Sequence, residues 1–293
     1  CEVFKSGFVN IIGLPNAGKS SLINRFMQDT FSIVTSKAQT TRHRALGIVN
    51  GNNYQLVISD TPGFTNPKNR IHDYMNKKIL DSFKDADIIL FMVELGIDKN
   101  RDVKLIEKVK KSKTPVLLLL NKVDKVNQTV LENESNFWKS EFKNSEIWMI
   151  SVKENFNIEN LMERIIELLP VGPKYFPDDA WTDKNERFFV NEIIREKIFK
   201  NYSQELPYVS EVITEKFKSK NKIIKISSLI IVEKESQKGI IIGNKGNSIK
   251  NIGTESRKDL ERFFNKKVFL ELNVKVYKDW RKNSNYLKKL GYN

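Results

Sequence analysis

The sequence is poor in the residues that build disulfide frameworks and zinc centres. Its 293 residues include one cysteine, Cys1, and two histidines, His43 and His72. One cysteine forms no internal disulfide and no cysteine-rich zinc site, which is typical of proteins from a reducing compartment. We assign neither histidine as a catalytic base.

Long apolar runs are also missing. No stretch is apolar over the roughly 20 residues that a membrane-spanning helix needs, and no signal-peptide pattern is present. The sequence does not begin with Met, so we expect its start to be trimmed or incomplete. With 40% hydrophobic and 29% charged residues, the composition is that of a soluble globular protein long enough for two domains.

Positive charge is in excess and unevenly distributed. The net charge is +14 and the isoelectric point is about 9.5. From residue 171 onward there are 26 basic and 16 acidic residues, a net charge of +10, whereas the first 170 residues carry 24 and 20, a net charge of +4. This excess favours a polyanionic partner, either nucleic acid or an anionic membrane surface, contacted by the second half.

The stretch from Gly13 to Ser20 matches G-x-x-x-x-G-K-[ST], the phosphate-binding loop. It lies between an apolar run at 7–12 and a helical pattern at 21–27, as the motif requires. Lys19 can reach the β- and γ-phosphates, and the hydroxyl of Ser20 can bind Mg²⁺. The predicted nucleotide-binding residues of this region are Gly13, Pro15, Asn16, Ala17, Gly18, Lys19, Ser20 and Ser21.

The first half alternates apolar runs with helical patterns. The expected strands are 54–59, 87–93, 115–120 and 146–151, and the expected helices lie near 73–84, 100–112, 128–143 and 157–169. This alternation predicts an α/β fold with a doubly wound sheet, in which ligands bind beyond the carboxyl ends of the strands.

Three further motifs follow expected strands. Asp60 can hold Mg²⁺ through water, and the backbone N–H of Gly63 can contact the γ-phosphate. In Asn121–Asp124, the Asp124 carboxylate can accept two hydrogen bonds from guanine that adenine cannot donate, so we expect a buried acid that rejects ATP. Asn121 can bond the phosphate loop, and Lys122 can cover the base. Ser151, Val152 and Lys153 can offer a backbone N–H to the base.

In this order the motifs resemble the TrmE–Era–EngA group of translation-factor-class GTPases, and the switch stretch 39–44 (QTTRHR) resembles the Era family. The resemblance implies GTP/GDP and Mg²⁺ as ligands, with Ser20, Thr41 and Asp60 at the metal. It implies catalysis by Lys19, Thr41, Gly63 and Asn16. Phe64 stands where Ras-like enzymes carry the glutamine that orients water, so hydrolysis should be slow. Asn16 either helps hold K⁺ against the phosphates or is a solvated loop residue.

A proline-rich stretch, 170–179, predicts a linker. Beyond it we expect an amphipathic helix at 186–202, strands at 208–217 and 222–233, a glycine-punctuated loop, a basic helix near 247–264 and a strand at 267–276. The loop ends in G-x-x-G and resembles the RNA-clamping loop of KH domains. The predicted RNA-binding residues are Gly243, Asn244, Lys245, Gly246, Lys250, Arg257 and Lys258.

The full prediction is a doubly wound α/β P-loop GTPase domain at 1–170, a linker at 171–183 and a smaller α+β KH domain of type II at 184–293 with a C-terminal tail. The Era resemblance implies a GTP-hydrolysing switch that binds the 3′ end of small-subunit ribosomal RNA and acts in small ribosomal subunit assembly. It implies a monomer in the cytoplasm, with peripheral contact to the inner face of the membrane.

Two alternatives stay open at this stage. One is an RNA-binding or RNA-chaperone protein in which the nucleotide is structural, and the other is a GTPase of the membrane surface. A tRNA-modifying relative of the TrmE type has no support, because no cysteine lies near the C-terminus.

Overall fold

The computed structural model describes residues 3–14, 16–28, 42–43, 45–61, 70–96, 103–203 and 205–292. Within them the chain forms two compact units, one comprising Cys1–Asn66 and Met75–Asp183, the other Pro67–Tyr74 and Lys184–Asn293. Pro15, Thr41, Gly63 and the side chain of Asp60, for which the sequence predicts roles at the site, lie outside the described residues. None of the described helices has the length and apolarity that crossing a membrane requires.

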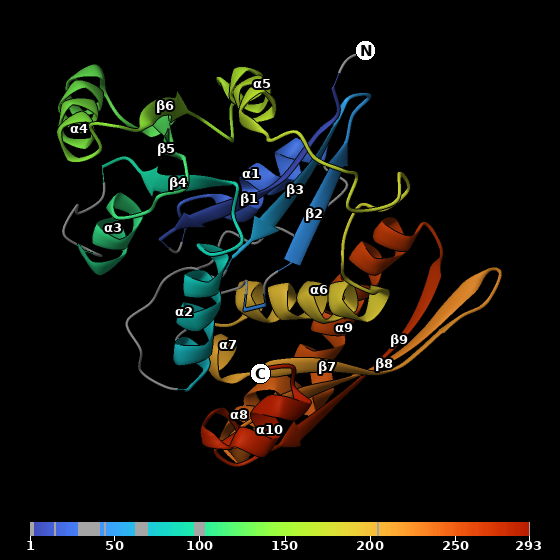
Figure 1. Ribbon diagram of the computed structural model, residues 1–293. Helices are drawn as coiled ribbons and strands as arrows, with labels where there is room; N and C mark the ends of the chain where they lie inside the picture. The colour runs from blue at the N-terminus through green and yellow to red at the C-terminus, as the bar shows by residue number, and fades with distance from the viewer. Residues whose placement is uncertain are drawn as a thin grey trace. The chain divides into compact units, whose positions relative to one another are not determined.

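The first unit is built on a six-stranded sheet in the order β2-β3-β1-β4-β5-β6 (Figure 1). Only β2 runs antiparallel to its neighbour. The strands are β1 (Lys5–Gly13), β2 (Ala45–Asn50), β3 (Tyr54–Asp60), β4 (Ile88–Glu94), β5 (Val116–Asn121) and β6 (Glu146–Ile150). The helices are α1 (Lys19–Phe26), α2 (Arg70–Ser82), α3 (Val103–Lys110), the short η1 (Val123–Lys125), α4 (Gln128–Glu141) and α5 (Ile158–Leu168). The start of α2, up to Tyr74, is counted with the second unit.

Continuous apolar sequence in β4 and β5 follows from burial on both faces. Alternate residues such as Phe91 and Leu118 join a core with Leu105 of α3 and Trp138 of α4, while their neighbours in the strands face the other side of the sheet. Figure 1 shows α1 and α5 on that other side. The predicted doubly wound α/β architecture is therefore confirmed.

The stretch predicted as a linker, 171–183, is part of the first unit. It follows the edge of the sheet: the N–H of Ile48 in β2 donates to the carbonyl of Trp181 over 3.0 Å, and the buried amide of Gln55 in β3 bonds both the N–H and the carbonyl of Phe176. The open edge of β2 supplies unpaired N–H groups, which this extended stretch satisfies. The boundaries at 170 and 183 stay a prediction.

The second unit is a three-stranded sheet, β7-β8-β9, with β7 antiparallel and β9 parallel to the central β8. Its strands are β7 (Glu211–Ser219), β8 (Ile223–Val232) and β9 (Lys267–Val276). Its helices are α6 (Glu186–Asn201), α7 (Leu206–Val209), α8 (Glu235–Ile242), η2 (Asn244–Gly246), α9 (Asn247–Phe264), η3 (Trp280–Lys282) and α10 (Ser284–Lys289). The predicted α+β class is confirmed.

Three expectations for this unit were wrong. Helix α6 is not amphipathic: Arg195, Glu196 and Lys197 are buried with its apolar residues, and Lys197 pairs with Asp259. The strand expected at 208 begins at Glu211, because α7 precedes it. Most of the expected glycine-punctuated loop is helix α8, and the Oε1 of Gln237 stabilises its start by accepting from the N–H groups of Glu233 and Lys234.

Candidate functional site

Neighbouring atoms leave no room for a side chain at either glycine of the phosphate loop. A Cβ atom at Gly13 would lie 2.3 Å from the carbonyl oxygen of Met92, and one at Gly18 would lie 2.5 Å from the side-chain nitrogen of Asn121. Gly18 has φ 103°, a conformation that favours glycine. No side chain caps α1 at Gly18. The first N–H groups of α1 therefore stand at a helix N-terminus suited to an anion.

Lys19 lies at the first position of α1 and is 7% exposed. Its ammonium donates to the carbonyl oxygens of Gly13 over 3.1 Å and of Leu14 over 2.7 Å, so the side chain folds across the loop that it follows. Ser20 and Ser21 come next in the same helical turn and are half-buried. This arrangement brings a cation, two hydroxyls and a helix N-terminus to one place.

The motif Asn121–Asp124 is bonded directly to the phosphate loop. Asn121 ends β5 and is 2% exposed, and its amide donates to the carbonyl of Ala17 over 2.8 Å. The Nζ of Lys122 donates to the carbonyl of Asn16 over 2.8 Å. Both contacts join β5 to the loop after β1. The sequence predicted the bond of Asn121, and the bond of Lys122 adds a second tie.

Glu94 is a site residue that the sequence analysis missed. It ends β4, its side chain is 17% exposed, and its Oε2 lies 2.7 Å from the Nζ of Lys122. The signal was available, because a carboxylate closing an apolar strand is unusual unless a cation faces it. Glu94 therefore fixes the lysine that bridges to the phosphate loop.

Asp124 and Ser151, both predicted to contact the base, come together in the structure. The hydroxyl of Ser151 donates to Oδ1 of Asp124 over 2.6 Å. This hydrogen bond is the main reason that the pKa of Asp124 lies below its usual range, so the group is a carboxylate at neutral pH. Asp124 is exposed rather than buried as we expected. Its second oxygen can face a ligand.

The turn formed by Ser151, Val152 and Lys153 is bonded to the motif Asn121–Asp124. The N–H of Val152 donates to Oδ1 of Asn121 over 3.2 Å, and Val152 is 6% exposed. The side chain of Lys153 extends into solvent beside Glu154. The backbone of this turn therefore orients Asn121, a use that the sequence analysis did not anticipate.

The predicted metal ligands are described only in part. Asp60 ends β3, and its Cα is in register with Ile11 of β1, two residues before the phosphate loop begins at Gly13. The hydroxyl of the next residue, Thr61, donates to the carbonyl of Ile11 over 2.5 Å and is fully buried. Thr61 is a second missed residue, since it anchors the end of β3 against β1.

The G-x-x-G loop of the second unit lies between α8 and α9. Gly243 and Gly246 have φ 71° and 77°, and Lys245 has φ 50°. A Cβ at Gly246 would meet nothing within 4 Å, whereas one at Gly243 would lie 2.4 Å from the hydroxyl of Ser248. The other predicted RNA-binding side chains of the loop and of α9 are exposed, namely Asn244, Lys245, Lys250, Arg257 and Lys258.

Each unit contains a stretch that matches a known protein family. Residues 8–122 match the family described as 50S ribosome-binding GTPase, and residues 205–281 match the KH domain family. GTPase Era of Syntrophus aciditrophicus (strain SB) is 43% identical over 297 residues, which cover 100% of this chain and 97% of the relative. The chain belongs to the Era family of GTPases.

Two solved Era structures agree over almost the whole chain. A crystal structure of an Era variant from Aquifex aeolicus bound to GDP·AlF4⁻ has a TM-score of 0.92 and 35% identity, and it covers 99% of each chain. Era in complex with MgGDPNP and nucleotides 1506–1542 of 16S ribosomal RNA has a TM-score of 0.93 and 36% identity, again over 99% of each. As an Era-family GTPase, the chain binds GTP and hydrolyses it, and it carries an RNA-binding KH domain.

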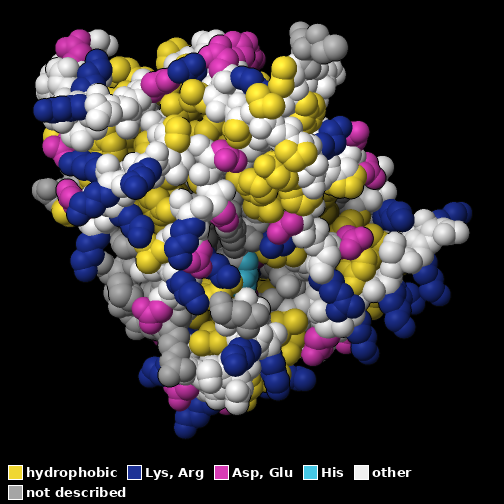
Figure 2. Space-filling model, in the orientation of Figure 1, with side chains coloured by type: hydrophobic (Ala, Val, Ile, Leu, Met, Phe, Trp, Pro, Cys, Tyr) yellow, Lys and Arg dark blue, Asp and Glu magenta, His cyan; other side chains and the backbone are white. Residues whose placement is uncertain are grey.

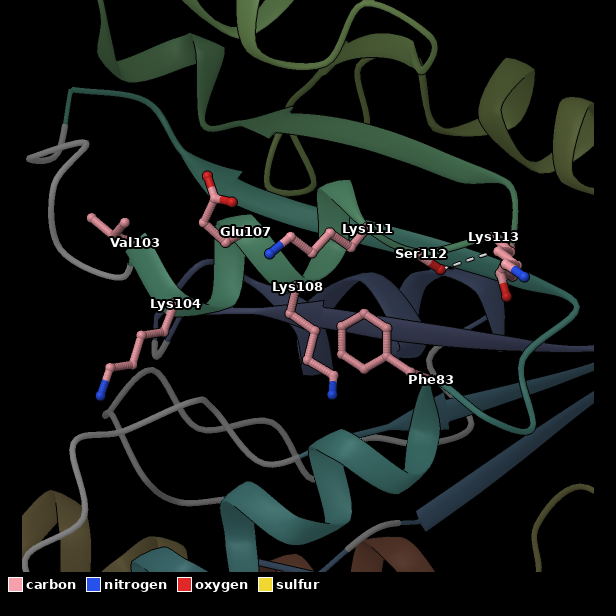
Figure 3. Close-up of a pocket in the computed structure, with 9 residues that line it drawn as sticks. Phe83, Val103, Lys104, Glu107, Lys108, Lys111, Ser112 and Lys113 are labelled. Atoms are coloured by element: carbon pink, nitrogen blue, oxygen red, sulfur yellow. Dashed lines mark hydrogen bonds between the residues drawn. The ribbon is translucent and has the colours of Figure 1, made fainter.

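A further depression in the first unit contains no residue of these motifs (Figure 3). It is lined by residues of α3, such as Lys104 and Lys108, by the segment after α3, which includes Lys111, and by Phe83, the residue that follows α2. Figure 3 shows Lys108 beside the ring of Phe83, and its Nζ lies 5.6 Å from the ring centroid. The depression is a basic surface distinct from the nucleotide site.

Proposed function

We propose that the chain is a GTP-driven switch that binds the 3′ end of small-subunit ribosomal RNA through its KH domain and acts in small ribosomal subunit assembly. In this proposal it works as a monomer in the cytoplasm. The observation that carries the proposal is the G-x-x-G loop, where Gly246 is open on its outer side beside exposed Lys245 and Lys250.

The choice of RNA follows from the relatives. The description of the matched GTPase family refers to the 50S particle and concerns residues 8–122 only. The relative solved with RNA is aligned over 99% of this chain, and the RNA in that complex is part of 16S ribosomal RNA, which belongs to the small subunit. Because that complex includes the KH domain, it favours small-subunit RNA as the ligand of this domain.

The RNA proposal is tested with Gly243→Asp and Gly246→Asp. Gly246→Asp adds a Cβ on the open side of the loop and a negative charge opposite phosphate, whereas Gly243→Asp adds the same charge and also crowds Ser248. Binding of a single-stranded segment from the 3′ end of 16S RNA should be strongly weakened in both variants, and Gly246→Asp is the variant that tests the RNA contact without a clash inside the protein. Losing one phosphate contact should also lower the salt slope by roughly one. Filter binding at several salt concentrations measures both effects.

A matched control adds the same charge elsewhere in the KH domain. Ser236 is exposed near the start of α8, away from the loop, and Ser236→Asp should bind the RNA as the parent does. GTP binding should be unchanged in all three variants. If the loop variants bind RNA normally, the G-x-x-G stretch is a simple turn and the proposal is wrong.

We further propose that Ser20, Asp60 and Thr41 hold Mg²⁺ on the phosphates of GTP. The chemistry of this set fits, since hydroxyl and carboxylate oxygens are the ligands that Mg²⁺ takes, and β3 ends at Asp60 in register with the strand that leads into the loop. When bound, the ion draws charge from the β- and γ-phosphate oxygens. Lys19 and the first N–H groups of α1 stabilise the charge that develops as water attacks.

Position 64 is Phe rather than the water-orienting glutamine of Ras-like enzymes, and we propose that K⁺, held with the aid of Asn16, supplies additional positive charge at the phosphates. Asn16 is exposed at the phosphate loop, has φ 68°, and its carbonyl is fixed by Lys122. Hydrolysis should be faster in K⁺ than in Na⁺ at equal ionic strength, and Asn16→Ala should remove the difference. Equal rates in both salts for the parent would contradict this role.

Anionic lipid is the competing partner for the positive charge. The net charge of +14 favours it as well as RNA, and we keep peripheral contact with the inner face of the membrane as a second proposal. Sedimentation with vesicles containing phosphatidylserine, beside the RNA assay, separates the two. Binding to vesicles that survives in Gly246→Asp would assign the contact to a different surface of the chain.

A further inference from the structure

The hairpin of β7 and β8 carries a dense group of cations. Figure 1 shows this hairpin extending from the rest of its unit, and Figure 2 shows Lys and Arg side chains gathered along it. With the adjacent start of β9, it presents six exposed lysines, which we call the hairpin lysine cluster: Lys216, Lys218, Lys220, Lys222, Lys225 and Lys267. Among the described residues, none of the six forms an ion pair.

Strand register aligns part of the cluster in one row. Lys218 of β7 is paired with Lys225 of β8, and Lys225 is paired with Phe269 of β9. Neighbouring residues in the strands, such as Ile224 and Val268, are buried at 2% and 4% exposure against the helices. The row therefore lies on the opposite face of the sheet.

In the part of the chain that the structure describes, this face is covered at one end and exposed at the other. Farther along, Ile231 is fully buried, and the indole N–H of Trp280 donates to the carbonyl of Val209 over 2.9 Å. The C-terminal segment thus covers that end. At the open end Phe269 is 57% exposed, with Lys225 opposite it in β8 and, on its own face of β9, Lys267 before it and Glu271 after it.

Structural roles do not account for this arrangement. Like charges directly opposite each other, as in Lys218 and Lys225, destabilise a sheet. Edge lysines can guard against unwanted strand pairing, but Lys225 lies in the central strand. An exposed Phe269 in the edge strand β9 would promote unwanted strand pairing rather than prevent it. A polyanion would relieve the repulsion and cover the ring.

We infer that this face is a second RNA-binding surface, in which the hairpin lysine cluster contacts phosphates and Phe269 stacks on an unpaired base. Lysines beside an aromatic platform are what single-stranded RNA requires. The inference rests on the proposed function, because it assigns more of the same RNA to the KH domain. A lipid surface would not need the ring placed among cations on a rigid sheet.

The distance from the G-x-x-G loop sets the RNA length. Helix α9 begins at that loop and has 18 residues, so it is about 27 Å long. Its last residue, Phe264, packs on Phe217 between Lys216 and Lys218, with ring centroids 5.6 Å apart. A G-x-x-G loop holds about four nucleotides. The second surface should therefore matter only for RNA that extends well beyond that clamp.

The test compares two RNA lengths in the full chain. Lys218→Ala with Lys225→Ala, and separately Phe269→Ala, are assayed with nucleotides 1506–1542 of 16S RNA and with an eight-nucleotide segment that fills the G-x-x-G loop. We expect each variant to lose roughly tenfold in affinity for the long RNA and less than twofold for the short one. The double lysine variant should also lower the salt slope for the long RNA by roughly two.

The matched control removes the same charge from the α3 depression, as Lys104→Ala with Lys108→Ala, and should change neither affinity. GTP hydrolysis and thermal unfolding report that every variant is folded. Unchanged long-RNA binding in the hairpin variants overturns the inference, and so does an equal loss for both RNA lengths or for the α3 control. Loss of vesicle binding alone makes lipid the partner and also overturns it. If the parent binds neither RNA, the proposed function itself fails.

Discussion

The chain has two glycine-containing loops that we propose to contact phosphate, and they differ in what demands the glycine. In the phosphate loop, a side chain at Gly13 would meet the backbone of Met92, and one at Gly18 would meet Asn121. In the G-x-x-G loop, a side chain at Gly246 would meet nothing of the protein within 4 Å. In the first loop, contacts with neighbouring residues require glycine. At Gly246 the requirement comes from the backbone conformation and, in our proposal, from the approach of RNA.

This difference separates stability from binding. Asn121 and Lys122 tie the phosphate loop to β5 through the carbonyls of Ala17 and Asn16. A change there disturbs packing, base recognition and phosphate binding together. At Gly246 the G-x-x-G loop has an open outer side, so we expect a change there to alter RNA binding with little effect on the fold. The following predictions test this contrast, from the largest expected effect to the smallest.

Gly13→Ala should have the largest effect. The added Cβ would lie 2.3 Å from a backbone oxygen that cannot rotate away, so we expect about 1–3 kcal/mol of destabilisation and loss of GTP binding. Thermal unfolding and titration with a fluorescent GDP analogue measure the two effects. Gly239→Ala is the matched control, because Gly239 lies in α8 with open space around it, and it should unfold at or above the parent's temperature.

Asp124→Asn should have an intermediate effect confined to the ligand. The amide replaces a carboxylate oxygen by a donor, so GTP affinity should fall on the order of 100-fold, and xanthosine triphosphate, whose O2 carbonyl can accept from the amide, should bind better. The unfolding temperature without nucleotide should barely change, because Asp124 is exposed. GTP affinity equal to that of the parent would remove the case for guanine recognition at this position.

Gly246→Ala should have the smallest effect. The site has room for a methyl group, and the cost is the left-handed φ of 77°, about 1 kcal/mol. RNA affinity should fall only a few-fold, far less than in Gly246→Asp, and GTP hydrolysis should be unchanged. If Gly246→Ala lowered the unfolding temperature as much as Gly13→Ala, packing within the protein would require glycine in the second loop as strictly as in the first.

The sequence by itself predicted which motifs meet at one edge of the first sheet and in which order the two domains follow. Motifs such as Gly13–Ser20 and Asn121–Asp124 are contiguous, and each follows a strand whose apolar run is visible in the sequence. Parallel strands bring their carboxyl ends to one edge, so the meeting of these motifs follows from the pattern alone. Helix α9 and strand β9 were likewise predicted with the bounds that the structure gives, because the periodicity of each is local.

Only the tertiary structure decided the contacts between residues that share no motif. Glu94 meets Lys122 because β4 and β5 are neighbours in register, with Glu94 opposite Asn121. The stretch 171–183 lies along the first sheet because the edge of β2 needs partners. Helix α6 buries charged residues that its sequence would place in solvent, since Lys197 finds Asp259 on another helix. The row of Lys218, Lys225 and Phe269 exists only through strand register, which the sequence of each strand leaves open.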